Sequence, residues 1–146
     1  MPAPTDSART EGPRAAAPGK PGFLTGAQAF LALVSSRLII RVGKFQLAHR
    51  VAEKWPTRGE KSYDFDRAEQ LVALIDRSSR FTTTKSWCLQ RSLAAVLLLR
   101  FHGVPAELTI GVRRVPFYAH AWAELAGRVI NDSQIVREKY AVIEQC

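Results

Sequence analysis

Cysteine, histidine and acidic residues occur in this sequence in an order that could support nucleophilic catalysis. Cys88 begins the segment Cys-Leu-Gln-Arg-Ser-Leu of residues 88–93, at the start of an apolar helical pattern. His120 begins the segment His-Ala-Trp-Ala-Glu of residues 120–124, which is typical of a strand, and an acid follows in Val-Ile-Asn-Asp of residues 129–132. In acyl transfer by a thiol, a histidine takes the proton of the cysteine, and an Asp or Asn orients the histidine. The sequence therefore predicts a cysteine nucleophile with its base and an orienting acid.

The position of Cys88 favours a reactive thiol. Ser86 is a natural N-cap for the helix that follows, so Cys88 would be about the second helical residue. There the free N–H groups and the positive end of the helix dipole favour thiolate over thiol, and the same N–H groups could hold an oxyanion. The alternative is a buried structural cysteine. The chain has two cysteines, too few for a disulfide scaffold, so Cys88 is interpreted as a free thiol.

The strand that carries His120 needs its orienting acid from a neighbouring strand. Alternation places Tyr118, His120, Trp122 and Glu124 on one face, and small alanines on the other, which predicts close packing against a large element. Glu124 lies four residues from His120 along a strand, roughly 13 Å away, and therefore cannot orient it.

The register of the hairpin that follows decides which residue, Asp132 or Asn131, can orient His120. A three-residue loop, 125–127, would pair residue 120 with 132 and place Asp132 directly across from His120, with Cβ atoms about 5 Å apart. A two-residue loop, 126–127, would pair residue 120 with 133 and put Asn131 on the histidine's face, diagonal to it. We favour Asp132, because a carboxylate also stabilises the imidazolium that forms when Cys88 loses its proton, and we keep Asn131 as the alternative.

Apolar periodicity predicts three helices before these strands. Residues 26–55 form the first, which can break near Gly43, and the second begins near Asp64 or Asp66. The second should bury Ala68, Leu71, Val72 and Ile75. The third, residues 86–102, is apolar all round, as in a central helix that is buried on every side.

A period of two residues begins after Pro105. It predicts a strand over residues 106–113, a hairpin of residues 117–125 and 128–132, and a last short strand or helical turn over 140–143. Helices followed by an antiparallel sheet indicate an α+β fold.

Length and composition indicate a single domain. The chain has 146 residues, and residues 1–22 contain five of its eight prolines, so we expect a disordered tail at 1–22 and a folded domain at 23–146. No apolar region follows Met1, and the apolar run 30–34 is interrupted by the polar residues 35–37. These features predict no signal peptide and no membrane span, and thus a cytoplasmic protein.

Positive charge is concentrated in residues 37–61, with seven Lys or Arg against two Glu, within a formal net charge of +8. A solvated helix face is the plainest interpretation, but Arg37, Arg41 and Lys44 are also candidates for binding a partner. No nucleic-acid-binding motif accompanies them.

Other residue types suggest no cofactor. The histidines and cysteines lack the paired spacing of metal ligands, and no glycine-rich phosphate loop is present. Trp87 and Trp122, beside the nucleophile and the base, could wall a substrate cleft or simply pack in the core.

Residues 88–94, 97–113, 120–124 and 127–132 together closely resemble the lasso-peptide biosynthesis B proteins, which are transglutaminase-like leader peptidases of bacteria. The resemblance implies a papain/transglutaminase-like fold, in which a buried helix that bears the nucleophile packs on a small antiparallel sheet. It also implies that a Cys-His-Asp triad, at Cys88, His120 and Asp132, removes the leader peptide from a ribosomally made lasso precursor.

The resemblance further implies partners. The chain has no room for a leader-recognition domain, so it looks like the split form, with a separate leader-binding protein and an ATP-dependent lasso cyclase that closes the ring. Rival hypotheses are an acyltransferase with the same triad, in which an amine replaces water, and a non-catalytic module that presents the leader.

Overall fold

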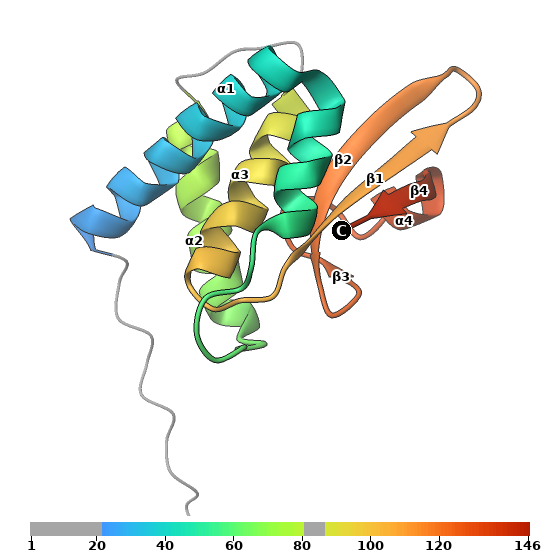
Figure 1. The fold of residues 1–146 in the computed structure, drawn as a ribbon. Coiled ribbons are helices and arrows are strands. Elements are labelled where there is room, and N and C mark those ends of the chain that lie inside the picture. Colours follow the sequence, from blue (N-terminus) through green and yellow to red (C-terminus); the bar gives the residue numbers. More distant parts are fainter. Residues whose placement is uncertain (1–21, 81–86) are drawn as a thin grey trace, which may run out of the picture.

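The computed structural model describes residues 22–80 and 87–146, which form a layer of helices on a four-stranded antiparallel sheet (Figure 1). The predicted disordered tail, apart from Gly22, and the predicted N-cap Ser86 lie outside the described residues. The elements are α1 (Phe23–Lys54), α2 (Phe65–Ser79), α3 (Trp87–Phe101), β1 (Glu107–Arg113), β2 (Tyr118–Leu125), β3 (Arg128–Val129), α4 (Val136–Lys139) and β4 (Ala141–Gln145). This arrangement confirms the predicted α+β class.

Helix α1 is continuous through Gly43, but it changes direction in its middle (Figure 1). Gly43 allows the bend, since a Cβ there would lie 2.1 Å from the Cβ of Leu47. The polar residues 35–37 do not interrupt the helix. The stretch Leu24–Gly43 of this helix is therefore long and apolar enough to cross a membrane, by length and composition alone, and little of it is buried.

Asp64 is the N-cap of helix α2, and its side chain accepts a hydrogen bond of 3.0 Å from the N–H of Arg67. Of the two predicted starts, the structure thus uses the earlier one, because the Asp64 carboxylate satisfies a free N–H of the first turn. The predicted buried residues of this helix are confirmed: Ala68, Leu71, Val72 and Ile75.

Helix α3 is the central element, as predicted. Ten of its 15 residues are buried, between α1, α2 and the sheet. The small residues Ala121 and Ala123 of β2 belong to the same core, and they let the strand approach the helix closely. The helix that carries Cys88 is therefore fixed on all sides.

The sheet has the order β3-β2-β1-β4. Strand β4 pairs with β1, so the last segment is a strand rather than a helical turn. On the face of β2 opposite α3, Trp122 packs with Val129, with Val136 of α4 and with Tyr140. The sheet is therefore covered on both faces near His120.

The favoured hairpin register is wrong. Glu124 pairs with Val129 and Leu125 with Arg128, so the loop is the two-residue turn of Ala126 and Gly127. Both turn residues have positive φ, 49° and 78°, which is typical of the type I′ turn that matches strand twist. Strand β3 is only two residues long, and the chain leaves the sheet after Val129.

Candidate active site

His120 and Asp132 are hydrogen-bonded to each other. The Nε2 atom of His120 lies 2.8 Å from Oδ2 of Asp132, and the other carboxylate oxygen accepts from the N–H of Ser133 at 2.7 Å. A carboxylate held in this way fixes the plane of the imidazole ring and favours its protonated form. Nδ1 is the ring nitrogen left to act on a neighbouring group.

Asp132 reaches His120 because the preceding residue, Asn131, ends the backbone pairing with β2. The Asn131 side chain is buried, and its Oδ1 accepts from the N–H of Ala123 at 2.7 Å, in place of a backbone carbonyl. Its Nδ2 donates to Oγ of Ser92 at 2.9 Å. Asn131 therefore faces α3 rather than His120, and of the two predicted acids only Asp132 contacts the histidine.

Two residues of the segment 88–93 connect α3 to this region. Ser92 Oγ donates to the carbonyl of Ala121 at 2.9 Å, and Arg91 donates to the carbonyl of Asn131. Arg91 also forms an ion pair with Asp76 of α2, with its Nε 3.5 Å from Oδ1. The helix that carries Cys88, the strand that carries His120 and the turn that carries Asp132 are thus joined by hydrogen bonds.

Cys88 lies in the first turn of α3 at the edge of the sheet, half-buried. Its thiol lies close to His120 and to the backbone N–H groups of Ala121 and Leu89, which act on its pKa. Burial alone would raise the pKa of the Cys88 thiol, but the hydrogen bonds and the nearby imidazole together lower it below its usual value. The structure therefore brings Cys88, His120 and Asp132 together.

The pKa of His120 shifts in the opposite direction. The hydrogen bond to Cys88 raises it most, burial lowers it, and the hydrogen bond to Asp132 raises it again, with a net rise. A lower pKa for the thiol and a higher one for the imidazole both favour a thiolate–imidazolium pair. Such a pair can attack a carbonyl carbon and then protonate the leaving group.

Tyr140 is a site residue that the sequence reasoning missed. Its ring centroid lies 5.3 Å from that of His120, and the Trp122 ring lies 6.1 Å from His120 in a stacked arrangement. Gly111 is paired with His120 across the sheet, where a Cβ would lie 2.7 Å from Trp122 and 2.8 Å from Tyr140. The glycine opposite His120 could have signalled that large rings close over this position.

Trp122 supports the site from within the core. It is fully buried, so it does not line an open cleft, and its Nε1 donates to Oε1 of Glu124 at 2.6 Å. Glu124 is also fully buried, with Arg137 Nε at 3.2 Å and Gln145 Nε2 at 3.3 Å. This buried carboxylate fixes the indole against the His120 ring.

Of the remaining predicted residues, Trp87 directly precedes Cys88, and the three basic residues lie on α1. Trp87 is half-buried at the start of α3, while Arg37 and Arg41 are exposed on α1, which also contains Lys44. Within the described ranges, no cluster of His, Cys, Asp or Glu could hold a metal ion.

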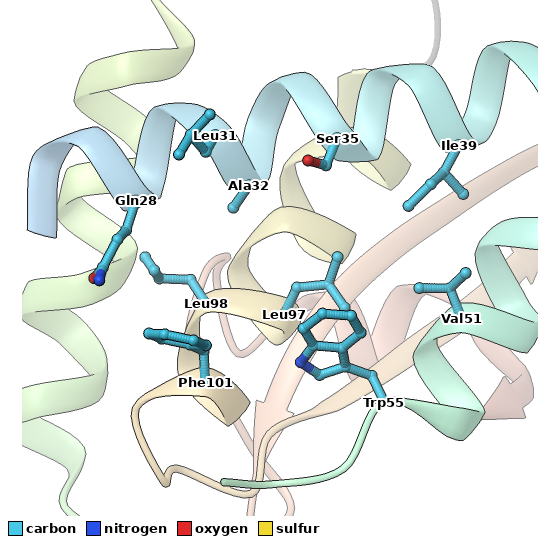
Figure 2. A pocket seen from close by; sticks show the side chains of 10 residues that line it. All are labelled: Gln28, Leu31, Ala32, Ser35, Ile39, Val51, Trp55, Leu97, Leu98 and Phe101. Atoms are coloured by element: carbon cyan, nitrogen blue, oxygen red, sulfur yellow. The ribbon is translucent and has the colours of Figure 1, made fainter.

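A hollow of about 380 Å³ lies between α1 and the C-terminal half of α3, and it is a separate feature from this site (Figure 2). Its lining is almost entirely apolar and includes Leu97, Leu98 and Phe101. Phe101 ends α3, about 20 Å along the helix from Cys88. The hollow is therefore not the substrate cleft.

Comparisons with known proteins place the chain in a family. The model of the transglutaminase-like superfamily matches residues 30–145. Microcin J25-processing protein McjB of Escherichia coli is 46% identical over 61 residues, which are 42% of this chain and 29% of McjB. The match thus spans less than a third of that relative. No solved structure matches the chain significantly.

We expect Cys88 to be alkylated by iodoacetamide at lower pH than Cys146 of the same molecule. The pKa of Cys146 is raised by burial, whereas that of Cys88 is lowered by its partners, so the two thiols provide an internal control. His120→Ala should move the Cys88 profile to higher pH. Peptide mapping of the alkylated protein over a pH series measures both, and identical profiles for the two cysteines would contradict the geometry.

Asn131 and Asp132 should differ in their effects. Asn131→Ala leaves the buried N–H of Ala123 without its partner and should lower the free energy of unfolding by about 2–4 kcal/mol. Asp132→Asn should change stability by about 1 kcal/mol or less, but it should shift Cys88 alkylation to higher pH, because a neutral amide no longer raises the pKa of His120. Urea denaturation and alkylation of both variants test this, and interchangeable effects would refute the assignment.

Proposed function

The chain belongs to the transglutaminase-like superfamily, and we propose that it is a cysteine peptidase that removes the leader peptide from a ribosomally synthesised lasso-peptide precursor. The observation that supports this proposal best is the hydrogen bond between His120 and Asp132 beside the Cys88 thiol, whose pKa His120 lowers. The partial match to a protein named for peptide processing is consistent with the same chemistry.

In this mechanism, His120 takes the proton of Cys88, and the thiolate attacks the carbonyl carbon of the bond between leader and core. The N–H of Cys88, in the first turn of α3, helps to hold the oxyanion. The C–N bond then breaks, His120 gives its proton to the leaving amine, and an acyl-thioester remains. Water, activated by His120, hydrolyses the thioester and restores the thiol. Asp132 stabilises the imidazolium in both steps.

We also propose that the protein acts with a separate leader-binding protein, and that a lasso cyclase uses the released core. Helix α1 offers a surface for such a partner, since it combines exposed Arg37 and Arg41 with large exposed apolar side chains. These side chains are Leu31, Val34, Leu38 and Val42. Exposed apolar patches of this kind often mark protein interfaces. A cytoplasmic location fits a substrate made on ribosomes.

Acyl transfer to an amine is the second candidate function, and the superfamily name favours it. The same thioester would form, but an amine rather than water would attack it. The products separate the two reactions, because transfer leaves a coupled species.

Incubation with a cognate precursor should give two fragments that mass spectrometry identifies as leader and core. Cys88→Ala should reduce the rate by about a thousandfold or more, because it removes the thiol that forms the thioester beside His120. The assay is run with and without a leader-binding protein. A coupled product would show that the reaction is acyl transfer rather than hydrolysis. Cleavage that persists in Cys88→Ala would refute the mechanism.

Charge reversal on α1 should weaken partner binding without changing the reactivity of Cys88. The test variant replaces Arg37, Arg41 and Lys44 by Glu, and the matched control replaces the exposed Lys54, Lys61 and Arg77 in the same way. We expect at least a tenfold loss of affinity for the leader-binding protein in the first variant only. Titration calorimetry measures this, and equal affinities for the two variants would remove the assignment of this surface.

A further inference from the structure

Strand β2 has a neighbouring strand on both sides over only part of its length. On one side it pairs with β1 from Tyr118 to Glu124, but on the other it pairs with β3 only at Glu124 and Leu125. The N-terminal half of β2 therefore presents an edge that no described strand covers. Cys88 and His120 lie at this edge.

The outward-facing backbone groups of β2 belong to its odd-numbered residues. The N–H of Ala123 donates to Asn131, and its carbonyl accepts from the N–H of Ile130 at 3.0 Å. Two residues earlier, the carbonyl of Ala121 accepts a hydrogen bond from the Ser92 hydroxyl, and the N–H of Ala121 contacts the Cys88 sulfur. Each of these groups thus has a partner from the turn after β3 or from α3.

Ala119 continues the same series. Its partner on β1 is Val112, and Val112 pairs on its other side with Ala141 of β4. Since backbone groups alternate in direction along antiparallel strands, both the N–H and the C=O of Ala119 point away from β1, as those of Ala121 and Ala123 do. Ala119 is exposed, and no residue of the described ranges bonds to these two groups.

We propose that this edge binds the substrate as an added β-strand, with the N–H and C=O of Ala119 exchanging two hydrogen bonds with one residue of an extended peptide segment beside the scissile bond. The inference rests on the proposed function and specifies its substrate as an unfolded chain in β conformation. Backbone pairing at a sheet edge is a general way of binding extended peptides.

The spacing along the strand matches this geometry. Two residues of a strand span about 6.7 Å, which is the separation between the outward groups of Ala119 and those of Ala121 beside the sulfur. In a peptide that pairs with Ala119, the next peptide group that faces β2 would therefore lie beside Cys88. Backbone pairing fixes the distance, whatever the side chains of the substrate are.

The hairpin beyond Ala119 provides side-chain contacts for the same segment. Val115, Phe117 and Tyr118 are 86%, 75% and 54% exposed, and the hairpin of β1 and β2 extends past the helical layer (Figure 1). Tyr118 also lies near Tyr140, with ring centroids 6.5 Å apart, and Tyr140 in turn lies beside His120. Aromatic rings thus lead from Tyr118, at the start of β2, through Tyr140 to His120.

An N-methyl scan of the precursor tests the pairing on the wild-type protein. Peptides that span the junction carry a single methylated backbone amide at each position other than the scissile bond, and kcat/KM is measured for each. One methylated amide, the donor to the carbonyl of Ala119, should lower kcat/KM at least tenfold, while its two neighbours, which point away from β2, should change it about threefold or less. Equal losses at adjacent positions, or no loss at any, would overturn the proposal.

Ala119→Pro tests the same contact from the protein side. Proline removes the outward N–H, and a strand tolerates it where that N–H faces an open edge. We expect cleavage of the precursor to fall at least tenfold through KM while iodoacetamide still alkylates Cys88, and cleavage at the wild-type level would overturn the proposal. If this variant does not fold, the N-methyl scan decides. If the unmodified precursor is not cleaved, the proposed function fails, and this inference fails with it.

Discussion

The carboxamide of Asn131 is the interaction on which the site depends. Its oxygen accepts a hydrogen bond from the backbone of β2 and its N–H donates to Ser92 of α3, so a single side chain joins the strand that carries His120 to the helix that carries Cys88. Because Asn131 ends the ladder in this way, the chain turns and brings Asp132 to His120. The adjacent Asn and Asp thus have separate roles, one in holding the segments together and one in contacting the imidazole.

A second constraint on His120 comes from the residues that share its face of the sheet, the face turned away from α3. The buried Glu124 accepts a hydrogen bond from Trp122 and forms an ion pair with Arg137 of α4, so the charge of the buried carboxylate is compensated. The indole that it holds packs against His120, and Tyr140 packs on the same ring. The imidazole is therefore fixed by rings as well as by Asp132, and an electron-rich ring face also favours its cationic form.

The sequence predicted the parts of this structure that depend on hydrophobic pattern. The all-round apolar pattern of α3 predicted its central position, and the alternation in β2 predicted which residues face the helices. The three-residue loop was wrong because Ala126 adopts positive φ, which its side chain disfavours and which spacing alone does not reveal. The approach of Asp132 to His120 was predicted from that wrong register, and it occurs for another reason, the side-chain bond of Asn131 in place of a ladder bond. Tyr140 was missed because it precedes a strand whose pairing with β1 cannot be read from its own residues.

Central α3 separates the region of Cys88 and His120 from the outer surface of α1. Among the described residues, those that contact the Cys88 thiol or the His120 ring come from residues 87–146, whereas α1 and α2 precede them and pack on other sides of α3. The outer surface of α1 can therefore accumulate substitutions during evolution without altering the distances between sulfur, imidazole and carboxylate. A protein built in this way can exchange one binding partner for another while its chemistry stays the same.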